Sequence, residues 1–253
     1  MKRVLTTLVL VPTVIWICLW SPQLVLLAAT SIVASLCFRE FRRFAAAHSM
    51  AVPGPLGYAA GLIILLVPSV HISLLFVAVA LTLLLALRSD DLKSVLPSAA
   101  GLSLALIYIY GAWRCGIELR LINPHLLLYA LSINWVGDVA AYFTGSAIGR
   151  HKLAPRVSPG KSWEGFFGSL LFTSAYGVAY LHYFQPDMPL PYAAALTATA
   201  NIGGQLGDLV ESAMKRGAGM KDSGTMLPGH GGWLDRLDSS LFSLPIVYFW
   251  LRH

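Results

Sequence analysis

Long apolar runs follow one another along almost the whole chain, and short polar or charged stretches separate them. Runs near the roughly 20 residues that a helix needs to cross a bilayer are expected at about 1–20, 22–38, 56–69, 70–87, 95–113, 126–148, 163–184, 190–210 and 237–251. Strands of a membrane barrel would be shorter and would alternate apolar with polar positions. The pattern therefore predicts an all-α, polytopic membrane helix bundle with about nine transmembrane helices.

Composition supports the membrane class and excludes several others. Hydrophobic residues make up 57% of the 253 positions and charged residues only 12%, about half the charged fraction of soluble domains. The net charge of +6 does not indicate a nucleic-acid partner, because the basic residues lie between apolar runs and form no basic domain. Cys18, Cys37 and Cys115 show no CxxC spacing, so neither a disulfide framework nor a metal site is expected.

The basic residues predict the topology. A cytoplasmic N-terminus places all 18 Lys and Arg residues on the cytoplasmic side except Arg114, Arg120 and Arg252, as the positive-inside rule requires. The loops 149–162 and 212–236 are then cytoplasmic. The basic start of the chain resembles a signal peptide, but no small-residue cleavage site follows, so residues 1–20 are expected to be the first membrane helix. The lack of a transit peptide favours a bacterial plasma (inner) membrane.

The two halves of the chain differ in polarity. Residues 1–125 carry few polar residues inside their apolar runs and are expected to be a transmembrane scaffold for packing, lipid contact or a homodimer. The charged stretches 39–43 and 88–93 are interpreted as turns that anchor at the lipid headgroups, rather than as substrate contacts. Residues 126–253 are expected to be the catalytic region.

Polar residues recur at helical spacing inside two of the later apolar runs. A carboxylate at membrane depth costs at least about 2.5 kcal/mol on insertion scales, so it should face a partner, a cation or a wet cavity. Helix-packing hydrogen bonds are the alternative explanation. The first run carries Asn134, Asp138 and Tyr142, and the second carries Asn201, Gln205, Asp208, Ser212 and Lys215.

Two polar segments adjoin these runs. The segment 145–165 contains Arg156, Ser158 and Lys161 among glycines and prolines, and clustered cations beside backbone amides suit a polyphosphate. It lacks the first glycine of a Walker motif, and a positive-inside anchor is the equal alternative. In and beside the segment 212–238, Asp208, Asp222, Asp235 and Asp238 are oxygen ligands of the kind that Mg²⁺ prefers. His230 has no partner at zinc-ligand spacing.

The segment 212–238 resembles the signature of the phosphatidate cytidylyltransferase family, also called CDP-diacylglycerol synthases. The family pattern has S-x-x-K-R, then K-D, then P-x-H-G-G, then D-R-x-D, and it fits Ser212, Lys215, Arg216, Lys221, Asp222, Pro228, His230, Gly231, Gly232, Asp235, Arg236 and Asp238. Upstream, Asp138 with Ala141 and Tyr142, and the run Ser158 to Gly165, resemble further family motifs. Trp233 departs from the pattern, where an aliphatic residue or Phe is usual.

The resemblance implies a magnesium-dependent nucleotidyltransferase of phospholipid biosynthesis, which converts CTP and phosphatidic acid of the membrane into CDP-diacylglycerol and pyrophosphate. The resemblance leaves open whether a second, monovalent cation binds beside magnesium. On this interpretation Asp208, Asp235 and Ser212 hold the metal, and Lys215, Arg216 and Lys221 bind the triphosphate. Lys161, Ser158 and Arg156 lie at the entrance used by the lipid phosphate or the nucleotide. Asn134, Asp138 and Tyr142 line the cavity. Asp222, His230, Arg236 and Asp238 complete the expected site.

Two other functions are compatible with parts of the sequence. A CTP-dependent kinase of a polyprenol-type lipid would use similar phosphate and metal groups, but it would transfer the γ-phosphoryl group and leave CDP. An ion-coupled transporter would also place charged residues at membrane depth. The transporter is disfavoured, because the charges gather at one membrane face and hydropathy indicates no inverted repeat.

Overall fold

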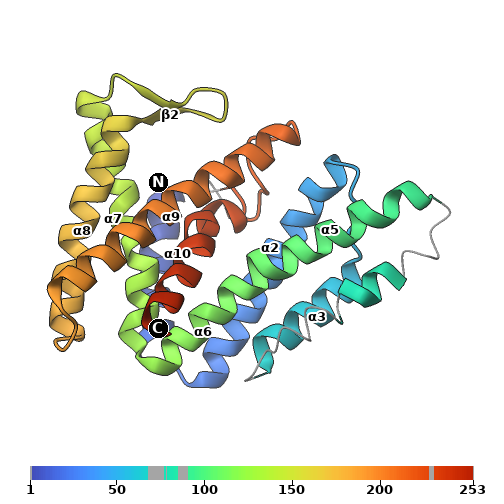
Figure 1. Ribbon diagram of the computed structural model, residues 1–253, viewed down its shortest axis with the longest axis horizontal. Coiled ribbons are helices and arrows are strands. Elements are labelled where there is room, and N and C mark those ends of the chain that lie inside the picture. The colour runs from blue at the N-terminus through green and yellow to red at the C-terminus, as the bar shows by residue number, and fades with distance from the viewer. Residues whose placement is uncertain (1, 68–76, 78, 85–90, 228–230, 253) are drawn as a thin grey trace. The chain divides into compact units, whose positions relative to one another are not determined.

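The computed structural model describes residues 2–67, 77, 79–84, 91–227 and 231–252 (Figure 1). The predicted span at 70–87 lies largely outside the described residues, and His230 also lies outside them. The chain divides into two compact units. The first comprises Met1–Ile17, Ser21–Ile117 and Met214–Arg236, and the second comprises Cys18–Trp20, Glu118–Ala213 and Leu237–His253.

The first unit is built mainly from helices of the N-terminal half. The chain forms α1 (Lys2–Leu19), α2 (Gln23–Ala47), α3 (Gly54–Leu66), the short η1 (Leu92–Ser94), α5 (Val95–Ala105), the π-helical turn η2 (Leu106–Gly111) and α6 (Ala112–Ile122). α2 packs against α3, α5 and η2. Phe38, Phe41 and Phe44 of α2 are buried, because side chains at helical spacing share one face, and the ring centroid of Phe38 lies 5.7 Å from that of Tyr110 of η2.

The second unit contains two helices that pack side by side along their length, α7 (Pro124–Ile148) and α8 (Trp163–Phe184) (Figure 1). An antiparallel hairpin connects them, formed by β1 (Lys152–Ala154) and β2 (Ser158–Ser162), with Lys152 opposite Ser162. The Ser162 side chain then caps α8 by accepting a hydrogen bond of 3.1 Å from the N–H of Gly165, as N-terminal serines commonly do. The helices α9 (Leu190–Gly217) and α10 (Leu234–Arg252) complete the described chain.

Hydrogen bonds between polar side chains hold the helices of the second unit together. Asn201 Nδ2 of α9 donates to Ser169 Oγ of α8 at 3.1 Å. Tyr129 OH of α7 lies 2.7 Å from Thr197 Oγ1 of α9. Such pairs satisfy polar groups that lipid cannot satisfy. Packing hydrogen bonds therefore account for part of the polar pattern seen in the sequence.

The prediction of a helical fold is confirmed, and the described part of the chain departs from all-α in the β1–β2 hairpin. In the described part of the chain, three helical segments are long and apolar enough to cross a bilayer, namely Gln23–Ala47, Leu92–Ile122 and Pro124–Ile148. Thr7–Leu19 and Gly54–Leu66 are shorter apolar helices. The count of about nine spans, the cytoplasmic N-terminus and the functional division at residue 125 stay predictions.

Several helical segments extend beyond their predicted ends, among them the run predicted at 95–113, which continues to Ile122. α2 continues to Ala47, so the charged stretch 39–43 lies within a helix and not in a turn. α9 continues to Gly217, so Ser212 and Lys215 belong to the same helix as Asp208. The polar stripe expected along the second run is therefore carried by one continuous helix into the segment 212–236.

Candidate functional site

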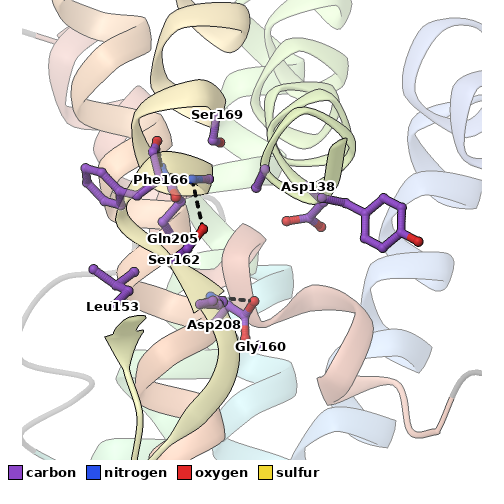
Figure 2. Close-up of a pocket in the computed structure, with 12 residues that line it drawn as sticks. Asp138, Leu153, Gly160, Ser162, Phe166, Ser169, Gln205 and Asp208 are labelled. Atoms are coloured by element: carbon purple, nitrogen blue, oxygen red, sulfur yellow. Dashed lines mark hydrogen bonds and ion pairs between the residues drawn. The ribbon is translucent and has the colours of Figure 1, made fainter. Parts of the chain in front are cut away.

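A polar pocket lies in the second unit, among residues of α7, α8, α9 and the hairpin (Figure 2). Its volume is about 250 Å³, below the roughly 300–1,000 Å³ of pockets that enclose drug-sized ligands. The space suits a phosphate-sized part of a larger substrate. Its polar lining consists of Asp138, Tyr142, Lys161, Ser162, Ser169, Gln205 and Asp208.

An ion pair between the hairpin and α9 lies at this pocket. Lys161 Nζ of β2 is 2.8 Å from Asp208 Oδ2 of α9, and Ser212 Oγ, one helical turn further along α9, donates to Asp208 Oδ1 at 3.3 Å. The side chains of Lys161 and Asp208 are 26% and 29% exposed. Both charges can therefore exchange partners with an anion or a cation that enters from solvent.

Hydrogen bonds hold the side chain of Gln205 at one wall of the pocket. Gln205 Nε2 donates to Asn201 Oδ1 at 2.8 Å and to the Phe166 carbonyl at 3.4 Å. Asn201 donates in turn to Ser169 and, at 3.3 Å, to Thr173. A linked set of this kind restricts the rotamers of each member. Figure 2 shows Ser169, Phe166 and Gln205 close together beside the pocket.

Buried carboxylates adjoin the pocket. Asp238 of α10 is 8% exposed, and it interacts electrostatically with Asp208, Glu211 and Asp138 of the same unit. Among the described residues, no group of three or more His, Cys, Asp or Glu side chains converges closely enough to hold a metal ion. Mg²⁺ commonly binds through one or two carboxylates together with substrate phosphates and water.

A second polar cluster lies in the first unit and surrounds Asp235. Lys215 Nζ is 2.6 Å from Asp235 Oδ1. Asp235 Oδ2 accepts hydrogen bonds from the N–H and Oγ of Ser223, both at 2.8 Å, and from the N–H of Gly232 at 2.7 Å. Burial raises the pKa of Asp235, but the Lys215 bond, the Gly232 N–H and Ser223 outweigh it, so the pKa lies below its usual range. Asp235 is therefore a charged and firmly held carboxylate.

The paired glycines of the signature are required by this cluster. Gly231 has φ +79°, in the left-handed region that glycine adopts without strain, and a Cβ there would lie 2.6 Å from Asp235 Oδ2. A Cβ on Gly232 would overlap Ser223 Oγ and Glu40 Oε2. In the structure the backbone approaches protein carboxylates closely.

The remaining predicted residues are distributed over both units. Asp138 and Tyr142 line the pocket, whereas Asn134 is buried and donates to Ser243 Oγ of α10 at 2.8 Å. Ser158 lies half-buried in β2. The exposed residues are Arg156, Arg216, Lys221, Asp222 and Arg236. The joint binding of a metal by Asp208, Asp235 and Ser212 stays a prediction.

Sequence reasoning missed Glu40 and Ser223. Glu40 was interpreted as part of a headgroup anchor, but it is buried and contacts the signature segment. A carboxylate among arginines at the end of an apolar run was the available signal. Ser223 lies inside the signature segment, between its fixed positions, and its hydroxyl contacts the carboxylates of Glu40 and Asp235.

Comparisons with known proteins agree with the signature. The family described as the cytidylyltransferase family matches residues 1–253. A protein of Staphylococcus aureus (strain COL) named phosphatidate cytidylyltransferase is 36% identical over 239 residues, which cover 88% of each chain. A protein of the same name from Bacillus subtilis (strain 168) is 42% identical over 153 residues, which cover 59% of this chain and 57% of the relative. Another from Staphylococcus saprophyticus is 32% identical over 238 residues, which cover 88% of each chain.

Proposed function

We propose, because this chain belongs to the cytidylyltransferase family, that it is a membrane nucleotidyltransferase that converts CTP and phosphatidic acid into CDP-diacylglycerol and pyrophosphate. A phosphate oxygen of phosphatidic acid attacks the α-phosphorus of CTP and forms a new P–O bond. The bond from the α-phosphorus to the bridging oxygen of the β-phosphate breaks, and pyrophosphate leaves. The relatives that carry the name of this activity are bacterial.

The observation that carries this proposal is the Lys161–Asp208 pair at the pocket of the second unit. A phosphate monoester is largely ionised at neutral pH, since its second pKa is about 6, so it needs little help from a general base. The reaction instead requires crowded negative charges to be neutralised and the reacting groups to be aligned. Lys161 places a cation at the pocket. An incoming phosphate can replace Asp208 as the anion paired with this cation.

Carboxylates of the second unit are candidate ligands for a divalent cation. Asp138, Asp208 and Asp238 carry the oxygen donors that Mg²⁺ prefers, and one or two carboxylates suffice where substrate phosphates and water supply the other ligands. We assign Asp208 as the first ligand, with Asp235 and Ser212 as further candidates. When bound, Mg²⁺ would neutralise charge on the phosphate oxygens. A monovalent cation beside it is compatible with the remaining carboxylates.

The basic residues of the signature have the task of holding the triphosphate. Arg216 and Lys221 are exposed, so their charged groups can reach an anion without loss of buried contacts. Lys215 is held by Asp235 at 2.6 Å and keeps a fixed direction before substrate arrives. These cations, with Arg156 and Lys161, lie in segments whose charge favours the cytoplasmic side. The site is therefore proposed to face the cytoplasm from a bacterial plasma membrane, where the lipid substrate lies.

One assay tests the reaction and its alternatives. The purified full-length protein is incubated with phosphatidic acid and CTP labelled at the α-phosphorus, with and without magnesium. Label in the lipid together with released pyrophosphate is the expected result, and chelation of magnesium should abolish it. Labelled CDP with a phosphorylated lipid would instead identify a kinase. An absence of any new product, with a polyprenol also tested, would refute an activity on these substrates.

A further inference from the structure

Glu40 is a buried carboxylate that binds the start of a helix far along the chain. It lies in α2, and its residue is 0% exposed. Its Oε1 accepts a hydrogen bond of 3.2 Å from the N–H of Trp233, and its Oε2 accepts one of 2.8 Å from the N–H of Leu234. Leu234 is the first residue of α10, where N–H groups have no partner within the helix. Glu40 therefore supplies acceptors and a negative charge at a helix N-terminus, where both are favourable.

The same carboxylate is linked to Asp235 by a serine. Ser223 Oγ lies 2.9 Å from Glu40 Oε2 and 2.8 Å from Asp235 Oδ2. A hydroxyl has one proton, so Ser223 donates to one of the two carboxylates at a time. Gly232 lies in the same turn and donates its N–H to Asp235. Ser223 and Gly232 thus set the direction of the Asp235 carboxylate. Glu40 in turn binds Trp233 and Leu234, the residues that directly follow Gly232.

A headgroup anchor does not account for Glu40. Its neighbours Arg39 and Arg43 are exposed, as anchors are, whereas the Glu40 side chain is buried away from them. A buried carboxylate loses its hydration and is retained only where hydrogen bonds replace it. Among the described residues, the bonds that replace it come from the signature segment, through Ser223, Trp233 and Leu234. The placement of Glu40 is therefore specific to that segment.

We propose that Glu40 is a positioning residue for the nucleotidyl transfer: it holds residues 231–234 so that Asp235 keeps one orientation. This inference rests on the proposed function, because it gives Asp235 a task in that reaction. It assigns a role in the site to the N-terminal half of the chain. Glu40 itself touches neither substrate in this scheme and acts through Ser223 and the backbone.

The decisive variant is Glu40→Gln, which keeps the size of the side chain but removes one of its two acceptor oxygens. Either the Trp233 or the Leu234 N–H then faces an amide NH₂ group. Loss of a residue that orients a metal ligand typically costs about 10–100-fold in activity or metal affinity. We expect kcat/KM for CTP to fall by about that factor and the half-saturating magnesium concentration to rise. Glu40→Asp, which retains both oxygens and the charge, should recover part of the loss.

Hydrogen exchange supplies a readout that needs no activity. In the full-length protein without substrate or metal, E40Q should speed the exchange of a peptide covering residues 231–236, because the N–H groups there lose their acceptor. Peptides from α8 should exchange as in the wild type. Glu118→Gln, at a half-buried glutamate of α6 outside this cluster, is the matched control and should leave exchange, kcat and the magnesium requirement unchanged.

The outcomes separate this inference from the proposed function. A wild-type protein that transfers no CMP refutes the function, whereas the exchange data still report whether Glu40 holds the turn. An active wild type whose E40Q variant matches E118Q in kinetics and exchange overturns the positioning role. If E40Q does not fold, Ser223→Ala decides: an unchanged magnesium requirement and unchanged exchange would overturn the proposal, and a shift in both would support it.

Discussion

Replacing Lys161 by Met should separate catalysis from stability. Lys161 Nζ lies 2.8 Å from Asp208 Oδ2, but the two side chains are 26% and 29% exposed, and ion pairs that reach solvent contribute about 0–1 kcal/mol to stability. Methionine keeps the apolar stem, so the thermal midpoint of unfolding should change little. Removing a group that stabilises charge in the transition state costs about 10²–10³ in kcat, and we expect a loss of that order.

The assay follows transfer of label from α-labelled CTP to lipid, alongside thermal unfolding in the same detergent. Lys152→Met is the matched control, because Lys152 is exposed on the neighbouring strand of the same hairpin, and it should keep wild-type activity. Asp208→Asn and the double variant K161M/D208N complete a cycle that measures the coupling of the pair. The reasoning fails if K161M keeps the wild-type kcat and KM, or if K152M loses as much activity as K161M.

Further predictions concern the signature and the helix packing. Gly232→Ala should destabilise the protein by about 1–3 kcal/mol through overpacking and reduce CMP transfer, whereas Gly160→Ala, where a Cβ meets nothing within 4 Å, should leave stability unchanged. Because the folded pKa of Asp235 lies below 3.8, its contribution to stability is present above about pH 4 and is lost as the pH falls through the folded pKa. Unfolding midpoints of Asp235→Asn and wild type should therefore differ at pH 6 and converge under more acidic conditions; a gap that persists would contradict the assignment. Asn134→Leu should lower stability by about 0.6 kcal/mol, the average for such bonds in membranes, with a proportionate loss of activity. A larger selective loss of activity would place Asn134 in the cavity.

The helical architecture was predictable because hydropathy reports burial in lipid directly. The later helices α7, α8 and α9 lie close to the predicted runs, and the stripe from Asn201 to Lys215 lies on one helix. The pocket residues Asp138 and Lys161 were also found in advance, since charged groups beside apolar runs need a partner or water. The residue types and their spacing were sufficient for these assignments.

The partners of these residues were not predictable from local patterns. The pairing of Lys161 with Asp208 joins segments separated by a whole helix, and no periodicity encodes such a contact. The β1–β2 hairpin was missed because its strands contain glycine, proline and charged residues, which have low strand propensity. Glu40 was misinterpreted because charge counting records where a residue lies along the chain and not which groups it binds.

Asp208 and Asp235, which are proposed as metal ligands, differ in how readily they could accept a cation before substrate binds. Asp208 is partly exposed and holds one cation and one hydroxyl, so it can accept a metal ion by exchange with solvent. Asp235 is 5% exposed at its side chain, and its oxygens already accept Lys215, Ser223 and Gly232. A divalent cation at Asp235 Oδ1 therefore requires Lys215 to move to another anion. The triphosphate is an anion that the substrate itself supplies, so metal binding at Asp235 and nucleotide binding should depend on each other.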